Sequence, residues 1–307
     1  MKIVLQILNL LFVFSKRSNF FSRISAEKRN TLLLRLKYLT QNWCSKENGF
    51  GLASCCQDLP LESLPESATS LNFKYNLCVD SEKPSGALRA IHLSNVHSLP
   101  HSLPELMKGL CDSNSMTEDQ QMQLFTQLRL AKNFADYSSR LKCIQARLVA
   151  LSIIVYCQSN ANIGPNEEAT NVVITNPIIE ELVDVLELDN KDIIEIKSAS
   201  LRTLTSITHH DRSSKVRLII EKTGAGSYHG FLPIMVRNCI NSLIEDHTTV
   251  SISFATALFS FLYHLSSYDA GCEALIQCGI MESLLKVIDW KEPESDHITV
   301  SIGHCFF

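Results

Sequence analysis

The stretch from Ser253 to Ile288 most constrains the fold, because it contains two apolar runs with the spacing of amphipathic helices. Apolar residues recur at steps of three and four along the first run, which places them on one broad helix face: Ala257, Leu258, Phe261, Leu262 and Leu265. A second run opens after Gly279, and we expect a short turn between them, built on Ser266, Ser267, Asp269 and Gly271. Helix pairs that recur along a chain indicate stacked helical repeats, which usually bind partners.

Similar units open at Pro177, Gly230 and Gly279, at intervals of 53 and 49 residues (230 − 177 and 279 − 230). These intervals are somewhat longer than the roughly 40–47 residues of armadillo and HEAT units, so we expect expanded loops. The sequence therefore predicts an all-α protein, an armadillo/HEAT-like α-solenoid with a long irregular insertion.

The predicted organisation has four parts. Residues 1–42 form a helical repeat whose first helix ends near Ser15 and whose second covers about 26–41. Residues 43–115 form the irregular insertion, because Pro and Gly interrupt them, with one candidate strand at Leu71–Tyr75. Residues 116–300 form armadillo-like helical repeats, which include a helix from Thr117 and another at Arg140–Gln158. Residues 301–307 form a divergent tail.

The N-terminal run MKIVLQILNLLFVF has two interpretations. It resembles a signal peptide, but Gln6 and Asn9 interrupt it and no small-residue cleavage site follows. The favoured interpretation is a helix packed on a neighbour through one apolar face: Val4, Leu8, Leu11, Ile7 and Phe14.

Charge and cysteine usage narrow the class of protein. The net charge is −4, which argues against nucleic acid as a direct partner, because phosphate binding needs a basic surface. The 11 cysteines are an odd number without a C-x-x-C pair. Five of them lie in or beside apolar helical runs, so reduced, buried thiols in an intracellular protein are expected: Cys143, Cys157, Cys239, Cys272 and Cys278.

One group of polar residues is a candidate binding site. Arg237, Asn238 and Asn241 form a polar side opposite Val236 and Ile240. Armadillo-type repeats often use Asn and Arg on such a helix to bind extended peptides. These three residues are therefore a possible partner-binding ridge, with ordinary surface exposure as the alternative.

Other polar groups favour structural interpretations over catalytic, metal or cofactor sites. His209-His210-Asp211 has no third metal ligand at a suitable spacing, and His suits a helix C-terminus. Gly224-Ala225-Gly226 lacks the Lys-Ser/Thr of a phosphate loop, and positive φ is expected at Gly226. The acidic residues Glu180, Glu181, Asp184 and Glu187 are expected on a solvated helix face. A redox role for Cys55-Cys56 is conceivable but disfavoured. We expect no catalytic residue, metal, cofactor or small-molecule ligand.

Five long segments resemble a known family: Lys46–Ala53, Ile179–Leu186, Glu195–Ile207, Gly226–Ile240 and Phe254–Gly271. They are similar to the N-terminal armadillo-like region of the giant HECT, UBA and WWE domain-containing E3 ubiquitin ligases, the Mule family. Asn9–Asn19 fits the same region. The resemblance covers most of residues 3–300 and weakens over roughly 58–116.

The resemblance implies a non-catalytic solenoid arm of a HECT-type ligase that shapes the enzyme and engages substrates. In that family, ubiquitin passes through a cysteine of a C-terminal HECT domain, and no segment of this sequence resembles that domain. The implied partners are protein substrates and other parts of the ligase, without membrane or nucleic acid. The implied localisation is cytoplasmic and nuclear.

Both ends depart from the family pattern. The family begins before the position equivalent to Met1, and after Val300 it continues as a helix where this chain reads SIGHCFF. We therefore expect a truncated chain whose open ends expose apolar helix faces and favour aggregation. Two alternatives stay open. A stand-alone helical scaffold requires a real stop after Phe307, and a secreted or membrane-anchored protein requires cleavage near Ser15 and oxidised cysteines.

Overall fold

The computed structural model describes residues 2–17, 23–40, 52–58, 137–160, 176–210, 214–245 and 250–289. Every regular element in these ranges is a helix, which confirms the all-α prediction. The chain divides into two compact units. The N-terminal unit comprises residues 1–154 and 163–172, and the C-terminal unit comprises residues 155–162 and 173–307. The four-part organisation proposed from the sequence stays a prediction.

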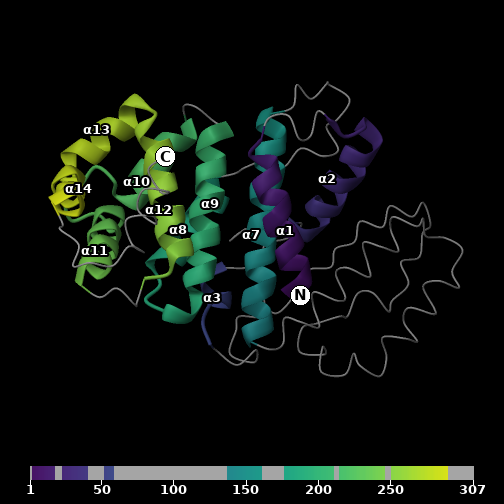
Figure 1. The fold of residues 1–307 in the computed structure, drawn as a ribbon, viewed down its shortest axis with the longest axis horizontal. Coiled ribbons are helices and arrows are strands. Elements are labelled where there is room, and N and C mark those ends of the chain that lie inside the picture. Colours follow the sequence, from purple (N-terminus) through teal and green to yellow (C-terminus); the bar gives the residue numbers. More distant parts are fainter. Residues whose placement is uncertain are drawn as a thin grey trace, which may run out of the picture. The chain divides into compact units, whose positions relative to one another are not determined.

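The N-terminal unit contains α1 (Lys2–Ser15), α2 (Ala26–Thr40), α3 (Leu52–Cys55) and most of α7 (Tyr137–Asn160) (Figure 1). The predicted helices at 1–15, 26–41 and 140–158 are confirmed. In α1 the buried residues are Leu8, Phe12 and Ser15, whereas Ile7 is 54% exposed. The expectation that Ile7 belongs to the packed face was wrong, because the buried stripe follows the 8–12–15 spacing. No described helix is long and apolar enough to cross a membrane.

Part of the predicted irregular insertion is fixed to α7. The Tyr137 hydroxyl donates a hydrogen bond of 3.0 Å to the Cys56 carbonyl. The Arg140 guanidinium donates one of 3.0 Å to the Gln57 carbonyl and lies 5.3 Å from the Tyr137 ring centroid. These bonds secure the end of α3 to the start of α7. The predicted strand at 71–75 and the predicted helix from Thr117 lie outside the described residues.

The C-terminal unit holds the last residues of α7 and a series of further helices. These are α8 (Asn176–Glu187), η7 (Lys191–Ile193), α9 (Ile194–His210), α10 (Ser214–Thr223), α11 (Phe231–Glu245), α12 (Ile252–Ser266), α13 (Asp269–Gln277) and α14 (Ile280–Asp289). The predicted openings at Pro177, Gly230 and Gly279 are confirmed by α8, α11 and α14.

Two helices of this unit were not predicted. α10 follows α9, and α13 occupies the place where a turn on Asp269 and Gly271 was expected. That expectation was wrong because Asp269 suits the first turn of a helix, and Gly271 is a site of close packing rather than a break. A Cβ at Gly271 would lie 2.0 Å from the Leu265 carbonyl oxygen. The long intervals between openings therefore contain a third helix as well as loops.

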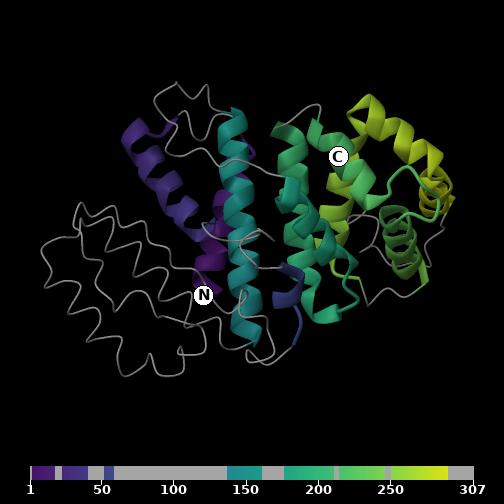
Figure 2. The ribbon, with the colours of Figure 1, turned by 180° about the vertical axis from the view of Figure 1, so that it is seen from behind.

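The packing in the C-terminal unit follows a three-helix period. α9 packs on α12, α10 packs on α13, and α11 packs on α14, so each of these three helices contacts the third helix after it. The α9–α12 pair has the most extensive packing among the described elements, and in both views the two helices lie next to each other within the unit (Figures 1 and 2). This period is the structural basis of the repeat that the sequence predicted.

The two helices of the α9–α12 pair bury different kinds of side chain. α12 contributes fully buried apolar side chains, including Leu258, Phe261 and Leu265. α9 contributes buried hydroxyl side chains, and Thr203 and Thr205 donate hydrogen bonds of 2.8 Å to the carbonyls of Ala199 and Leu201. These bonds satisfy the hydroxyls within α9, so small side chains can face a neighbouring helix without a desolvation cost.

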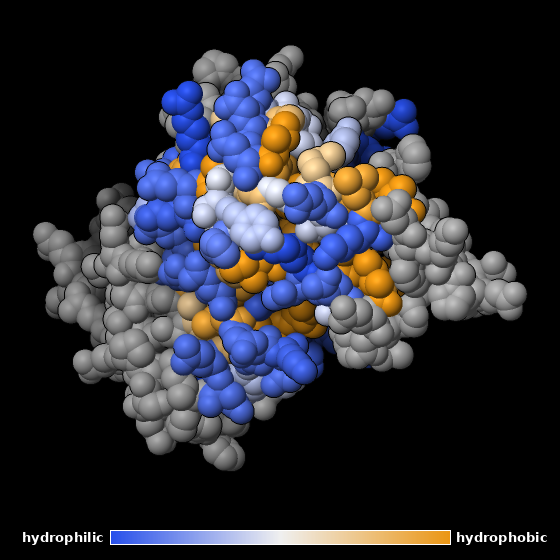
Figure 3. All heavy atoms as spheres, turned by 90° about the vertical axis from the view of Figure 1, so that its left-hand side faces the viewer, coloured by the Kyte–Doolittle hydropathy of each residue, from blue (hydrophilic) through white to orange (hydrophobic). Residues whose placement is uncertain are grey.

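The outer side of α14 carries an apolar stripe. Met281, Leu285 and Ile288 follow an i, i+4, i+7 spacing and are 54%, 53% and 77% exposed. Figure 3 views this side of the C-terminal unit and shows apolar patches between hydrophilic ones. Exposed apolar stripes of this kind mark interaction surfaces or aggregation sites.

Candidate partner-binding pocket

The three-helix period is broken between α8 and α11, and a pocket lies there. These two helices form no packing comparable to that of α9–α12 or α11–α14. The pocket has a volume of about 320 Å³ and is lined by the end of α8, the start of α9, one side of α11 and the start of α12. The site is thus a consequence of the way in which the repeats stack.

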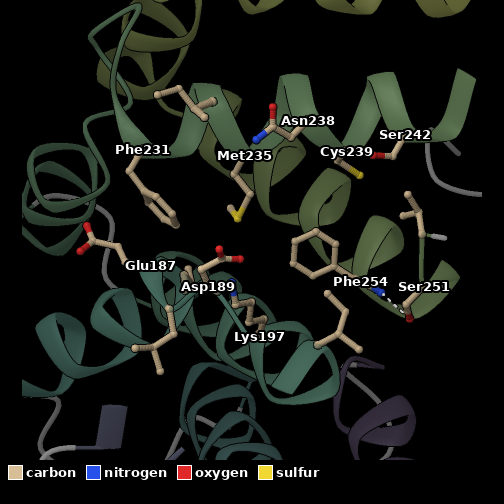
Figure 4. A pocket seen from close by; sticks show the side chains of 15 residues that line it. Glu187, Asp189, Lys197, Phe231, Met235, Asn238, Cys239, Ser242, Ser251 and Phe254 are labelled. Carbon is tan, nitrogen blue, oxygen red and sulfur yellow. Dashed lines mark hydrogen bonds between the residues drawn. The ribbon is translucent and has the colours of Figure 1, made fainter. Parts of the chain in front are cut away.

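Apolar side chains form most of the pocket wall. Figure 4 shows Phe231, Met235 and Cys239 projecting from α11 towards the space above α9, with the ring of Phe254 entering from α12. Leu186, Ile194 and Val250 complete this surface. Such a lining favours an apolar ligand group over an ion or a polar metabolite.

Charged groups lie on the side formed by α8 and α9. Glu187 and Asp189 are exposed, and Lys197 is half-buried. Burial lowers the pKa of Lys197, while the negative charge of Asp189 acts in the opposite direction. Lys197 and Asp189 therefore interact electrostatically, and the solvent-facing charge of this side is negative.

The structure separates the three residues of the predicted ridge. Asn238 is exposed and lines the pocket, and Asn241 is exposed on the same helix. Arg237 is half-buried, with its guanidinium 4.3 Å from the Tyr228 ring centroid and hydrogen-bonded to the Tyr228 carbonyl. The Arg237 side chain thus holds the loop before α11 through Tyr228, while the two asparagine side chains are accessible to a partner. The binding role of the ridge stays a prediction.

A polar network fixes the α9 and α12 sides of the pocket. The Ser251 hydroxyl accepts a 3.4 Å hydrogen bond from the Phe254 amide, which caps α12, and donates a 3.2 Å hydrogen bond to the Glu195 carboxylate. Ser253 donates to the same carboxylate at 3.2 Å and accepts from the Arg202 guanidinium at 2.8 Å. Burial lowers the pKa of Arg202, and the charge of Glu195 opposes that shift.

His209, near the end of α9, belongs to an aromatic cluster. The His209 ring centroid lies 5.6 Å from that of Tyr156 and 5.9 Å from that of His264. Among the described residues, no group of three His, Cys, Asp or Glu could hold a metal ion. Asp211 lies outside the described residues.

Three other sequence expectations need correction. Gly224, rather than Gly226, has the positive φ, 61°, because the chain turns at the end of α10. Glu181 is fully buried instead of lying on the solvated face of α8, although Glu187 is exposed as predicted. Cys272 is exposed, whereas the other four cysteines predicted to be buried are buried, and the described cysteines are free thiols.

Most of the pocket was not predicted from the sequence. Asn238 was singled out, but Lys197 and Asp189 were not, because they lie on elements whose contact with α11 depends on tertiary packing. A local signal existed in Phe231 and Met235, which share a helix side with Asn238 and would be unusual on a solvated face.

Helices that stack with a three-helix period define the chain as a helical-repeat protein. Residues 78–241, just over half of the chain, match the family described as Domain of Unknown Function (DUF908), and the chain belongs to this family.

Longer relatives share almost the whole sequence. The E3 ubiquitin-protein ligases HUWE1 of Mus musculus and of Rattus norvegicus are each 49% identical over 306 residues, which cover 97% of this chain and 7% of each ligase. The E3 ubiquitin-protein ligase UPL2 of Arabidopsis thaliana is 26% identical over 279 residues, which cover 89% of this chain and 7% of the ligase. The predicted resemblance to the N-terminal region of such ligases is confirmed. The chain spans only a small part of these relatives.

Proposed function

We propose that this chain is a non-catalytic solenoid arm of a HECT-type E3 ubiquitin ligase, which shapes the ligase and engages its protein substrates. The observation that carries the proposal is the 49% identity to the HUWE1 ligases over 97% of the chain. Identity of this extent in a segment of stacked helices supports a shared role within a larger ligase.

The pocket supports substrate engagement over a purely structural role. A helical repeat whose only task is rigidity gains stability from closing every stacking interface, because buried apolar area is the main source of that stability. Here the α8–α11 interface leaves an open pocket with Phe231 and Met235 in its wall. Asn238 supplies an exposed amide beside it.

We further propose that the protein acts in the cytoplasm and the nucleus, the compartments that the family resemblance implies. Immunofluorescence of the protein tagged at its chromosomal locus, with parallel cell fractionation, tests this point. Signal in both compartments is expected. Signal confined to the secretory pathway would contradict the proposal.

The first experiment asks whether the chain is joined to a ligase. Long-read sequencing of the transcript across the codons for Val300–Phe307 should show further helical repeats and a HECT-coding region. The protein isolated with an antibody against α10 should form a ubiquitin adduct that reducing agents cleave, since a HECT cysteine carries ubiquitin as a thioester. A transcript that stops after Phe307, together with the absence of an adduct, would favour a stand-alone scaffold.

The second experiment asks whether the arm selects substrates. In the full-length protein, Asn238→Lys combined with Asn241→Lys places two charges on the exposed side of α11. The set of ubiquitinated cellular proteins should change relative to wild type, whereas Gln277→Lys on α13 should leave it unaltered. The thioester adduct should be retained in all variants. Identical substrate sets in wild type and the double variant would contradict substrate engagement by this side.

A further inference from the structure

We infer that the α8–α11 pocket binds an extended peptide segment in which two neighbouring apolar side chains stand beside a Lys or Arg. This inference rests on the proposed substrate-engaging function and names the chemistry that the pocket recognises. It concerns a short linear motif, not a folded surface or a small metabolite.

The volume of the pocket favours side chains over a packed helix. At about 320 Å³ the pocket lies at the lower limit of ligand sites, which span roughly 300–1,000 Å³. A helix about 10 Å across that followed α11 for three turns would fill on the order of 1,000 Å³. The space therefore accommodates a few inserted side chains of an extended chain, while the backbone of that chain stays near the surface.

The lining provides an apolar anchor and a polar edge. Phe231, Met235 and Phe254 form the anchoring surface, and burial of an apolar group there removes its area from water. Asn238 and Ser242 lie along α11 at the i and i+4 positions of one helix side. The amide of Asn238 can both donate to and accept from a peptide group, which is the chemistry that an extended backbone requires.

The charges around the pocket favour a positive charge on the peptide residue next to the apolar anchor. Its lining includes two carboxylates, Glu187 and Asp189, and one ammonium group, Lys197, a net charge of −1. The Lys197 charge is half-buried and interacts with Asp189, whereas Glu187 is exposed at the end of α8. A cationic side chain next to the anchor would gain from Glu187, and an anionic one would be repelled.

The pocket is held open before any ligand arrives. Hydrogen bonds from Ser251 and Ser253 to Glu195 join the start of α12 to the start of α9. Arg202 adds a bond to Ser253 in the same network. Because these elements form two sides of the pocket, a peptide meets a preorganised site and loses less entropy on binding than it would in forming one.

The test applies a random peptide library to the full-length protein, tagged at its locus and immobilised on beads. Wild type should enrich peptides with two apolar residues beside Lys or Arg. Ile234, which is 40% exposed and lines the pocket, is changed to Glu, and Ile252, which is 67% exposed and does not line it, is changed to Glu as the matched control. The Ile234→Glu variant should lose the enrichment, and the Ile252→Glu variant should retain it.

The charge requirement is tested separately with Glu187→Lys, and Glu273→Lys on α13 serves as its control. The Glu187→Lys variant should bind the best apolar–basic peptide about three- to tenfold more weakly and still bind the version with neutral residues. Circular dichroism of each variant checks that helices are intact, and Met235→Lys replaces Ile234→Glu if that variant is unfolded.

Three results would overturn the inference: no enrichment by wild type, enrichment of acidic peptides, or equal enrichment by wild type and a folded Ile234→Glu or Met235→Lys variant. The ubiquitin thioester assay is independent of all three. A protein that forms the adduct but enriches no peptide would refute the pocket motif and leave the ligase proposal standing. A protein that enriches the motif without an adduct would refute the ligase proposal.

Discussion

Ser253 at the start of α12 and Glu195 at the start of α9 are 58 positions apart in the sequence, yet the serine Oγ donates a hydrogen bond of 3.2 Å to the carboxylate. Arg202 donates a 2.8 Å hydrogen bond to the same serine oxygen. This contact connects α9 and α12, the second helices of two successive repeats. Apolar packing alone is not directional and would allow α9 and α12 to shift along each other. The directional hydrogen bonds of this network fix the register of the two helices.

Replacing Ser253 by Ala should lower the free energy of unfolding by about 1 kcal/mol, because Arg202 and Glu195 each lose a hydrogen-bond partner. Urea denaturation followed by circular dichroism measures the change. Ser266→Ala is the control, since Ser266 is exposed and donates a hydrogen bond within its own helix end, to the Tyr263 carbonyl. Equal shifts for the two variants would show that the network adds nothing to stability.

Alanine substitutions at two glycines of the loop between α10 and α11 should have different effects on stability. A Cβ at Gly230 would lie 1.9 Å from the Gly224 carbonyl oxygen, so Gly230→Ala must displace backbone and should destabilise the protein by at least about 2 kcal/mol. A Cβ at Gly226 would meet its nearest atom at 3.8 Å. Gly226→Ala should therefore be neutral, or stabilising by about 0.4–1 kcal/mol. Thermal unfolding compares them, and similar midpoints would contradict this packing.

Alkaline pH should destabilise the fold through Cys143. Burial raises the pKa of this thiol from 9.0 to about 11, against the opposing charge of Arg147. The unfolded chain therefore loses this proton at lower pH than the folded chain does. Stability is fully present below pH 9 and falls, by roughly 2–3 kcal/mol, as pH rises to 11.

Comparison with Cys143→Ala isolates this effect from other groups. Burial also raises the pKa of Tyr156, to about 12, which destabilises at still higher pH, and the lowered pKa of Lys197 acts in the opposite sense. These contributions are common to both proteins. The difference in unfolding free energy between wild type and variant should decline between pH 9 and 11. A difference that is constant with pH would refute the prediction.

The apolar stripe of α14 should drive self-association of the 307-residue chain. Leu285 and Ile288 are more than half exposed, and pairing such stripes removes apolar area from water. The double variant Leu285→Lys, Ile288→Lys should therefore shift sedimentation-velocity profiles towards the monomer. Glu273→Lys, on an exposed position of α13, controls for the change in net charge. If the double variant associates as strongly as wild type, the self-association uses a surface other than the α14 stripe.

Local pattern was sufficient to predict several elements. The spacing of Leu258, Phe261 and Leu265 identified α12, and all three are fully buried. Pro177 and Gly279 located the openings of α8 and α14 within one residue of the helices. These predictions held because helix periodicity and terminal residues act over a few positions.

Predictions failed where long-range packing outweighed local propensity. Gly271 looked like a turn residue, but it lies within α13. Glycine is required there because a Cβ would clash with the Leu265 carbonyl. Glu181 looked like a surface residue, but the neighbours of α8 bury it completely. Gly224 has the positive φ that was assigned to Gly226, because the position of the turn depends on where α10 ends.

The sequence by itself determined that the chain is helical, repetitive and similar to a segment of large E3 ubiquitin ligases, because periodicity and long shared segments are properties of the linear chain. Tertiary structure alone decided that the repeats stack with a three-helix period and open between α8 and α11. It also brought Asp189, Lys197 and Asn238 to one pocket. Their proximity depends on helix packing over some fifty residues of separation, which no local pattern encodes.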